Sequence, residues 1–251
     1  GLSMEDAVKA ADERVVSIPY LGVSRGRNES LLLSSRGVSY SQQSNEVAAW
    51  CGPLLQDGDS RKTGMQIYHR REWDPQAGKR IGAEAVKKAV ELLKASPISG
   101  GKLPVVLDEY MAPRFLGMFF GAFSAESAQR GMSRLQGRLG ETIAIPELTL
   151  LDDPHRQGAN RSCFLDAEGF LTKPLPLIEE GVFRNFLYHV ESANKENKSS
   201  TGHAVRGYSG GISTRSHNLV WPTGELNLEQ LCTQNSKCLL VTQLEGQAGC
   251  N

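Results

Sequence analysis

The most apolar run in the sequence is FLGMFFGAF, at positions 115–123, and it contains no charged side chain. A helix needs about 20 apolar residues to cross a bilayer, so this run is too short to span one. Its large apolar side chains recur at helical spacing and form one broad stripe. Gly117 and Gly121 fall on a neighbouring face, where another backbone could approach closely. We therefore expect a buried packing helix here, and no membrane span.

The charge balance argues against nucleic acid as a direct partner. The 251 residues include 28 basic and 28 acidic side chains, whereas a protein built to hold nucleic acid normally carries a basic excess. The amino terminus is acidic and amphipathic, without the basic and then apolar regions of a secretory signal. Five cysteines without a CxxC pair are typical of reduced thiols. These features predict a cytoplasmic protein.

Along the first hundred residues, the sequence predicts a helix, then several strands, then a second helix. A short helix is expected at 3–14 and a longer one at 82–98, where Pro97 would stop it. Between 15 and 68, β-rich runs are broken by possible turns at 25–28, 34–37 and 56–59. We therefore expect several short antiparallel strands.

The remainder of the chain returns mostly to strands and turns. A strand is predicted at 105–107, Asn227 should cap a helix, and SKCLLVTQLEG should contain a late buried strand. Strands grouped with a few helices, without regular βαβ alternation, favour an α+β fold. We expect two packed α+β halves with mostly antiparallel or mixed sheets, and a boundary near 99–102.

Two acidic turns are candidates for chemistry. LLDDPHRQG contains Asp152, Asp153 and His155, and FLDAEG contains Asp166 and Glu168. Paired carboxylates can bind a metal or transfer protons. The same residue types also form turns in which the Asp side chain bonds nearby backbone N–H groups, and the sequence leaves both interpretations open.

Other candidate sites are weaker. No two histidines have the spacing of a zinc protease helix, and Cys232, Cys238 and His217 match no standard zinc pattern. The segment SSTGHAVRGYSGG is rich in glycine and hydroxyl groups. It could offer backbone N–H groups and a cation to a peptide carboxylate, or it could be an exposed linker. Its candidate binding residues are Ser200, Thr201, Gly202, His203 and Arg206.

Several separated motifs nevertheless occur in a characteristic order. They are Asp-x-Glu-Gly at 166–169, Ile-Glu-Glu-Gly-Val at 178–182 and Ser-Thr-Gly-His-Ala at 200–204, within longer matching segments that include GRLGETIAIPELTLLDDP and LLVTQLEGQAG. In these motifs the chain resembles the PmbA/TldD family, whose members often carry the label modulator of DNA gyrase. The resemblance covers most of the chain and is strongest after about residue 103.

The resemblance implies an α+β protein of the bacterial cytoplasm. In paired members, a TldD-type subunit holds zinc and cleaves flexible peptides, and a PmbA (TldE)-type subunit lacks the metal motif but is required as partner. The family is longer at both ends. We therefore expect 1–101 to be the remainder of an N-terminal α+β domain, and 102–251 to be a C-terminal α+β domain incomplete at its C-terminal end.

The resemblance also locates the family's zinc motif, HExxxH, in the apolar run. Aligned on the preceding VVL strand and a shared glycine, the two histidine positions become Gly117 and Ala122, and the glutamate position becomes Met118. Hydrogen, thioether and methyl groups cannot serve as zinc ligands or a general base at such a site. The chain is thus expected to resemble the PmbA side of the family, with no metal, cofactor or catalytic residue of its own.

The expected function is support of a TldD-type metalloprotease in the proteolysis or maturation of flexible peptides, within a homo- or heterodimer. Under this hypothesis the 199–211 segment, Asp166 and Glu168 face the partner or the peptide. One rival is an independent metal-dependent peptidase or hydrolase that uses Asp152, Asp153 and His155 with Asp166 and Glu168. A DNA gyrase-modulating binding protein is a third, less favoured reading because the net charge is zero.

Overall fold

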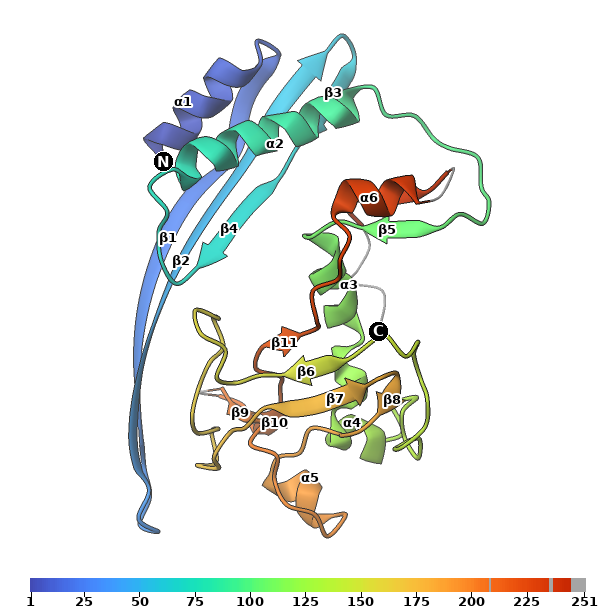
Figure 1. The fold of residues 1–251 in the computed structure, drawn as a ribbon. Helices are drawn as coiled ribbons and strands as arrows, with labels where there is room; N and C mark the ends of the chain where they lie inside the picture. The colour runs from blue at the N-terminus through green and yellow to red at the C-terminus, as the bar shows by residue number, and fades with distance from the viewer. Residues whose placement is uncertain (208, 235–236, 245–251) are drawn as a thin grey trace. The chain divides into compact units, whose positions relative to one another are not determined.

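The computed structural model describes residues 1–207, 209–234 and 237–244 (Figure 1). It divides into two compact units, Gly1–Ser99 with Gly158–Asn160, and Gly100–Gln157 with Arg161–Asn251. Helices and mostly antiparallel sheets occur in both, which confirms the predicted α+β class. No helix in the described ranges is long and apolar enough to cross a membrane.

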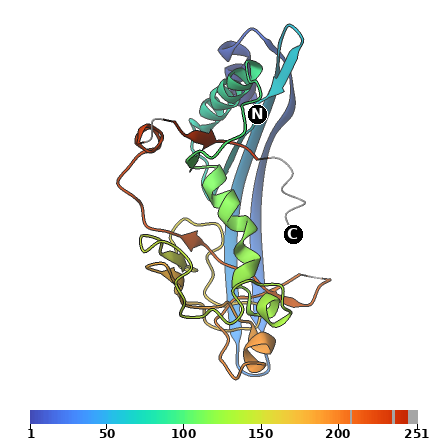
Figure 2. The same ribbon diagram turned by 90° about the vertical axis from the view of Figure 1, so that its right-hand side faces the viewer.

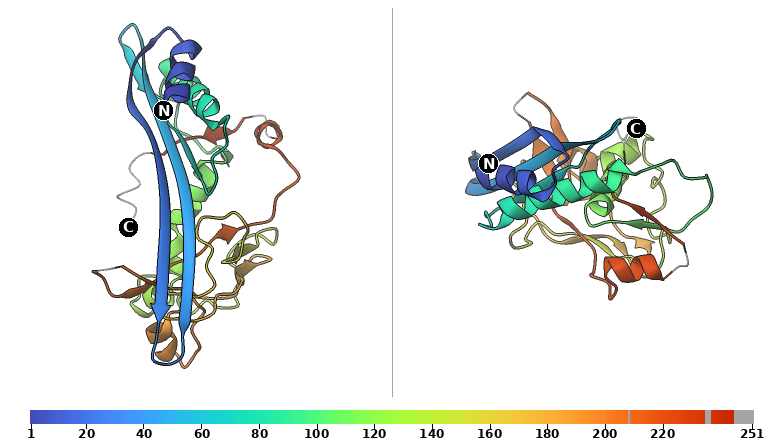
Figure 3. Two further views of the ribbon diagram at one scale, coloured as in Figure 1. Left: turned by 90° about the vertical axis from the view of Figure 1, so that its left-hand side faces the viewer. Right: turned by 90° about the horizontal axis from the view of Figure 1, so that it is seen from above.

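The first unit is built on a four-stranded antiparallel sheet. Strands β1 and β2 pair along their length, and β3 and β4 both pair with β2. Helices α1 and α2 lie side by side on one face of this sheet (Figures 1 and 3). The elements are α1 (Leu2–Ala11), β1 (Val15–Leu33), β2 (Ser39–Asp57), β3 (Ser60–Thr63), β4 (Gln66–Arg70) and α2 (Ala77–Leu93).

The prediction of several short strands between 15 and 68 was wrong for the first two. Strands β1 and β2 each contain 19 residues and form the long ribbon in Figure 3. The expected turn at 25–28 lies inside β1, where Arg25 pairs with Val47 and Asn28 with Ser44. Cross-strand pairing along the ribbon therefore outweighs the local turn preference of an Arg-Gly-Arg-Asn sequence. The turns expected at 34–37 and 56–59 are present.

The core of the first unit explains its helices. Helix α2 presents Ile81, Ala85 and Ala89 at helical spacing, all of them buried. Helix α1 adds Met4 and Val8, and the sheet adds small and aliphatic residues such as Ala49, Cys51 and Leu55. Helix α2 begins at Ala77, five positions before the predicted start, because the chain already turns into it after Asp74 and Pro75.

The described part of the second unit contains three small sheets. The largest has the order β11-β6-β7-β8 and is antiparallel, β9 pairs with β10, and β5 pairs in parallel with β12. The strands are β5 (Val105–Leu107), β6 (Leu150–Asp152), β7 (Leu175–Glu179), β8 (Val182–Phe183), β9 (Ala204–Arg206), β10 (Ile212–Thr214), β11 (Leu219–Val220) and β12 (Leu239–Val241). The helices are α3 (Met111–Met118), the 3-10 helix η1 (Phe120–Phe123), α4 (Ala125–Gln129), α5 (Val190–Asn194) and α6 (Leu228–Thr233).

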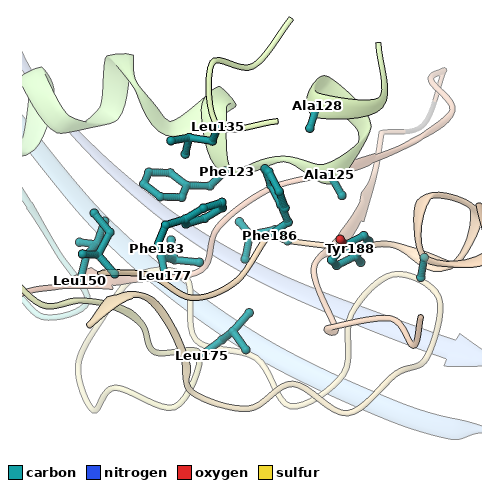
Figure 4. Packing of buried hydrophobic residues seen from close by; sticks show 13 residues of the cluster. Phe123, Ala125, Ala128, Leu135, Leu150, Leu175, Leu177, Phe183, Phe186 and Tyr188 are labelled. Carbon is teal, nitrogen blue, oxygen red and sulfur yellow. The ribbon is translucent and has the colours of Figure 1, made fainter. Parts of the chain in front are cut away.

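An aromatic cluster fills the core of the second unit. Phe183 has no exposed surface, and its ring meets those of Phe123 and Phe186 edge to face, with centroids 5.9 and 4.7 Å apart. Figure 4 shows this group surrounded by leucines and alanines. Since these aromatic residues come from η1 and from the chain around β8, the cluster fixes the end of the apolar run against the main sheet.

The apolar run itself does not form the predicted buried helix. Helix α3 ends at Met118, tighter 3-10 turns follow, and Ser124 caps the separate helix α4 by accepting from the N–H of Ser127 (Figure 2). Phe119 is 53% exposed and Phe115 is 37% exposed. A Cβ added at Gly117 or at Gly121 would meet no described atom within 4 Å. The predicted α-helix therefore continues only to Met118, and its burial is confirmed at Phe123 but not at Phe115 or Phe119. The close backbone approach at the two glycines was wrong.

Other predicted elements have mixed outcomes. The strand at Val105–Leu107 is confirmed, as is the Asn227 cap, whose side chain accepts from the N–H of Gln230. The late strand exists as β12, but it is not buried, since Leu239 and Leu240 are 36% and 40% exposed.

A pair of glycine variants tests where backbones approach closely. A Cβ at Gly82 would lie 2.6 Å from the Met4 carbonyl oxygen and 3.0 Å from the Ala7 Cβ. Gly82→Ala should therefore destabilise the first unit by about 1–3 kcal/mol through overpacking. Gly117→Ala should be neutral or stabilising by up to about 1 kcal/mol, because it adds helix propensity in open space. Urea unfolding measures both, and equal losses would contradict this difference.

A buried histidine–carboxylate network as candidate functional site

Asp152 is the centre of a buried polar network in the second unit. It ends β6, is fully buried, and accepts hydrogen bonds from the His217 backbone N–H at 3.0 and 2.9 Å and from His203 Nε2 at 3.1 Å. Strand β11 carries His217 there, because Leu219 pairs with Asp152. The buried carboxylate thus joins β6, the approach to β11 and the start of β9.

The two histidine rings lie in contact, with centroids 4.8 Å apart. His217 Nε2 lies 2.9 Å from the Gly202 carbonyl, which can only accept, so this nitrogen carries the proton. Its Nδ1 lies 3.4 Å from Cys163 Sγ. Burial lowers the pKa of His217 below its ordinary value, and the nearby His203 lowers it further. Neutral His217 therefore accepts from the Cys163 thiol through Nδ1.

The contact with His217 does not make Cys163 an activated nucleophile. Burial, followed by the charges of Asp166 and Asp152, raises the pKa of the Cys163 thiol to about 11. A reactive cysteine needs a lowered pKa and a thiolate, whereas this thiol stays protonated and donates. The pair holds together two segments that are far apart in the sequence.

The buried His217 ring predicts acid sensitivity. Well above pH 6.5, the ordinary pKa of histidine, His217 is neutral in both the folded and the unfolded chain. Below that value the unfolded chain binds a proton that the folded one resists, so this contribution to stability is lost as pH falls. Unfolding of the second unit should therefore become easier between about pH 7 and about pH 5.

The matched variants are His217→Gln and His155→Gln. Glutamine at 217 can still donate to the Gly202 carbonyl but does not titrate, so it should flatten the pH dependence of the unfolding free energy. His155 is exposed, and its replacement should leave the pH dependence as in the parent chain. A parent-like slope in His217→Gln would contradict the assignment.

The carboxylates of the Asp-Ala-Glu-Gly turn bind backbone groups. Asp166 Oδ1 accepts from the N–H groups of Glu168 and Phe170 at 3.0 and 2.9 Å, and its Oδ2 accepts from Ala204 N–H at 3.0 Å. Glu168 Oε2 accepts from Val190 N–H at 2.8 Å, at the start of α5. These bonds support the turn interpretation and connect this turn to β9 and α5.

The other acidic turn is partly exposed. Asp153 Oδ1 accepts from the His155 N–H at 2.9 Å. The His155 ring stacks near Phe164, with centroids 5.1 Å apart, and its Nε2 lies 3.1 Å from the Thr172 hydroxyl. Within the described ranges no three His, Cys, Asp or Glu side chains form a group that could hold a metal ion.

The segment from 199 onward is more enclosed than an exposed linker. Gly202 and His203 are buried, Ser200 and Thr201 are partly buried, and Arg206 at the end of β9 is exposed. Thr201 Oγ1 accepts from Tyr188 N–H at 2.8 Å and lies 2.9 Å from His203 Nδ1. Gly202 has φ of +75°, and a Cβ there would lie 2.8 Å from the Leu171 carbonyl oxygen, so only glycine fits. A binding role for these residues stays a prediction.

Sequence reasoning grouped Asp152 with Asp166 in one hypothesis and Asp166 with His203 in another, but it did not pair Asp152 with His203. It had considered His217 only with Cys232 and Cys238, whereas its thiol partner is Cys163. Cys163 lies 54 positions from His217 and Asp152 lies 51 positions from His203. No spacing rule in a single sequence signals such contacts.

The positions aligned with the zinc motif lie where α3 passes into η1. Gly117 is in the last turn of α3, Met118 ends that helix, and Ala122 is in η1. Space is available at Gly117, since an added Cβ would touch nothing in the described chain. None of these three residues has a side chain of the kind that binds zinc in proteins.

Comparison with known protein families identifies the family of this chain. Residues 100–251 match the PmbA/TldA metallopeptidase C-terminal domain, and residues 1–93 match the PmbA/TldA metallopeptidase central domain. The chain belongs to the PmbA/TldD family. Glycine, methionine and alanine stand at the positions that the resemblance assigns to the zinc motif, and the absence of a zinc site there stays a prediction.

Individual relatives agree with this membership. An uncharacterised Methanocaldococcus jannaschii protein is 33% identical over 190 residues, which cover 74% of this chain and 44% of the relative. Metalloprotease PmbA of Escherichia coli O157:H7 is 26% identical and covers 97% of this chain and 52% of its own length. The crystal structure of TldE from Thermococcus kodakarensis has a TM-score of 0.87 at 25% identity, with 98% of this chain and 56% of TldE covered. The chain thus spans about half the length of these PmbA/TldD relatives.

Proposed function

We propose that this chain acts in a PmbA/TldE-type subunit that does no zinc chemistry itself and supports peptide cleavage by a TldD-type metalloprotease. The observation that carries the proposal is the presence of Gly117, Met118 and Ala122 at the positions that the family resemblance assigns to the HExxxH motif. The likeness to TldE supports the same side of the family. A cytoplasmic location and a dimeric state are parts of this proposal.

The arrangement of the second unit suggests how such a subunit would contribute. The buried network around Asp152 fixes β6, β9 and β11 relative to one another. Arg206, at the exposed end of β9, remains available to a peptide carboxylate or to the partner. Under the proposal this region forms heterodimer contacts and helps to line a channel for an extended peptide.

Co-expression tests the proposal. The chain, carrying a removable tag, is produced with a TldD-type protein that has an intact HExxxH, and the pair is isolated through the tag. We expect co-elution in size exclusion, and cleavage of an unstructured peptide only when both proteins are present. Absence of association would contradict the proposal.

A metal measurement separates the proposal from the independent hydrolase. After tag removal, the chain alone should contain no stoichiometric zinc and should not cleave the peptide. Stoichiometric zinc together with cleavage that is lost in His155→Ala would establish the hydrolase instead.

Arg206→Ala tests the proposed supporting role of the chain. This variant should weaken peptide cleavage by the pair of proteins while leaving the unfolding free energy of the chain unchanged.

A further inference from the structure

Cys232 and Cys238 lie against each other at the junction between α6 and β12. Helix α6 begins with a reciprocal capping box between Asn227 and Gln230, and Cys232 lies in its last turn. Cys238 immediately precedes β12, and its Sγ donates to the Cys232 carbonyl oxygen at 3.3 Å. That carbonyl is one of the groups that a helix end leaves without an intrahelical partner. The contact therefore holds the residue before β12 next to the end of α6.

The two thiols also interact directly. Partial burial raises the pKa of the Cys232 thiol, and so do the proximity of Cys238 and a side-chain hydrogen bond with it. Both side chains are partly exposed. The two sulfurs are therefore in contact with each other and open to small reagents.

The other described cysteines are in different settings. Cys51 is fully buried in the core of the first unit. Cys163 donates to His217 and has its pKa raised to about 11. Neither combines access to solvent with a second thiol as neighbour. Within the described chain, the pair at 232 and 238 is thus the one in which two solvent-accessible thiols lie in contact and can close an internal disulfide.

We propose that Cys232 and Cys238 form a reversible dithiol–disulfide pair that a small-molecule disulfide such as oxidised glutathione closes. A thiolate of the pair attacks one sulfur of glutathione disulfide, forms a mixed disulfide and releases one glutathione thiolate. The second cysteine thiolate attacks the protein sulfur of that mixed disulfide and releases the other glutathione. The two protein thiols are oxidised to one S–S bond, glutathione disulfide is reduced to two thiols, and the two protein protons pass to them.

The bond would act on the strand that supports α3. Strand β12 pairs with β5, and the Val241 carbonyl accepts from Asp108 N–H at 3.2 Å. Asp108 Oδ1 in turn accepts from the N–H groups of Tyr110 and Met111 at the start of α3. Fastening Cys238 to α6 would restrict β12 and, through Asp108, the start of α3. The inference is independent of the proposed protease partner.

Oxidation of purified protein tests the pair. Cys250 lies outside the described residues, so the parent for this experiment carries Cys250→Ser. After incubation with oxidised glutathione and removal of excess reagent, the intact mass should fall by two hydrogens, and peptide mapping should join Cys232 to Cys238. The rate should rise with pH as the thiols ionise, and reductant should restore the original mass.

Two controls make the outcome decisive. Cys238→Ser in the same background should give a glutathione adduct at Cys232 and no internal disulfide, and Cys51→Ser should behave like the parent. Amide hydrogen exchange at Leu239–Val241 should slow at least several-fold on oxidation of the parent and should not change in Cys238→Ser. Stable glutathione adducts on both cysteines of the parent, or a disulfide to another cysteine, would overturn the pair. A disulfide that leaves exchange in β12 unchanged would overturn its effect on the strand.

Discussion

Replacement of Asp152 by alanine should lower the unfolding free energy of the second unit by about 3–5 kcal/mol. The carboxylate is fully buried and accepts from the His217 backbone N–H and from His203 Nε2. Alanine would leave both buried donors without their acceptor, and each such group costs about 1–3 kcal/mol. The loss exceeds the net value of the hydrogen bonds themselves, because both donors are buried and the alanine side chain offers them no acceptor.

The measurement can be confined to this unit. The chain has three tryptophans, and Trp221 alone belongs to the second unit while Trp50 and Trp73 belong to the first. In a Trp50→Phe, Trp73→Phe background, Trp221 fluorescence therefore follows urea unfolding of the second unit. Asp153→Ala is the matched control and should cost about 1 kcal/mol or less, since it loses one bond to the exposed His155. Similar losses for the two variants would refute the central role of Asp152.

Replacement of Phe183 by alanine should cost about 3–5 kcal/mol in the same assay. Its side chain is fully buried between Phe123 and Phe186. Truncation removes the transfer free energy of the ring, leaves a cavity and ends two edge-to-face contacts (Figure 4). Because Phe123 ends η1, the variant should also loosen the chain between η1 and α4, which amide hydrogen exchange would detect.

Phe119→Ala is the control for the aromatic cluster. Phe119 lies four positions before Phe123 but is 53% exposed, so its loss should change the unfolding free energy by about 1 kcal/mol or less. The two substitutions remove the same side chain and differ in burial. An equal effect at 119 and 183 would contradict the difference in burial between Phe119 and Phe183.

Local signals identified several elements correctly. Regular apolar spacing located most of α2, an Asn-x-x-Gln sequence predicted the cap of α6, and β-branched residues after a glycine-rich joint located β5. These features depend on a few neighbouring residues. The motif order at 166–204 likewise predicted the PmbA/TldD family, to which the chain belongs.

Elements that depend on distant contacts were not predicted. Arg25–Asn28 looked like a turn, yet β2 lies alongside and continues the ladder through it. Phe115 and Phe119 looked like core residues by their type, yet burial depends on what else packs there, and they are more than one-third exposed. The candidate site shows the same limitation, since its hydrogen bonds join segments more than 50 residues apart.

By itself, then, the sequence determined the α+β class, the main helical segment and the family. These follow from residue types and short spacings, which are properties of the covalent chain. Only the tertiary structure decided that Asp152, His203, His217 and Cys163 form one hydrogen-bonded network. It also decided that the apolar run leaves α3 after Met118, with Phe119 exposed and Phe123 buried. Both outcomes depend on which side chains are removed from water and on hydrogen bonds between distant segments. These arise only when segments far apart in the sequence come together.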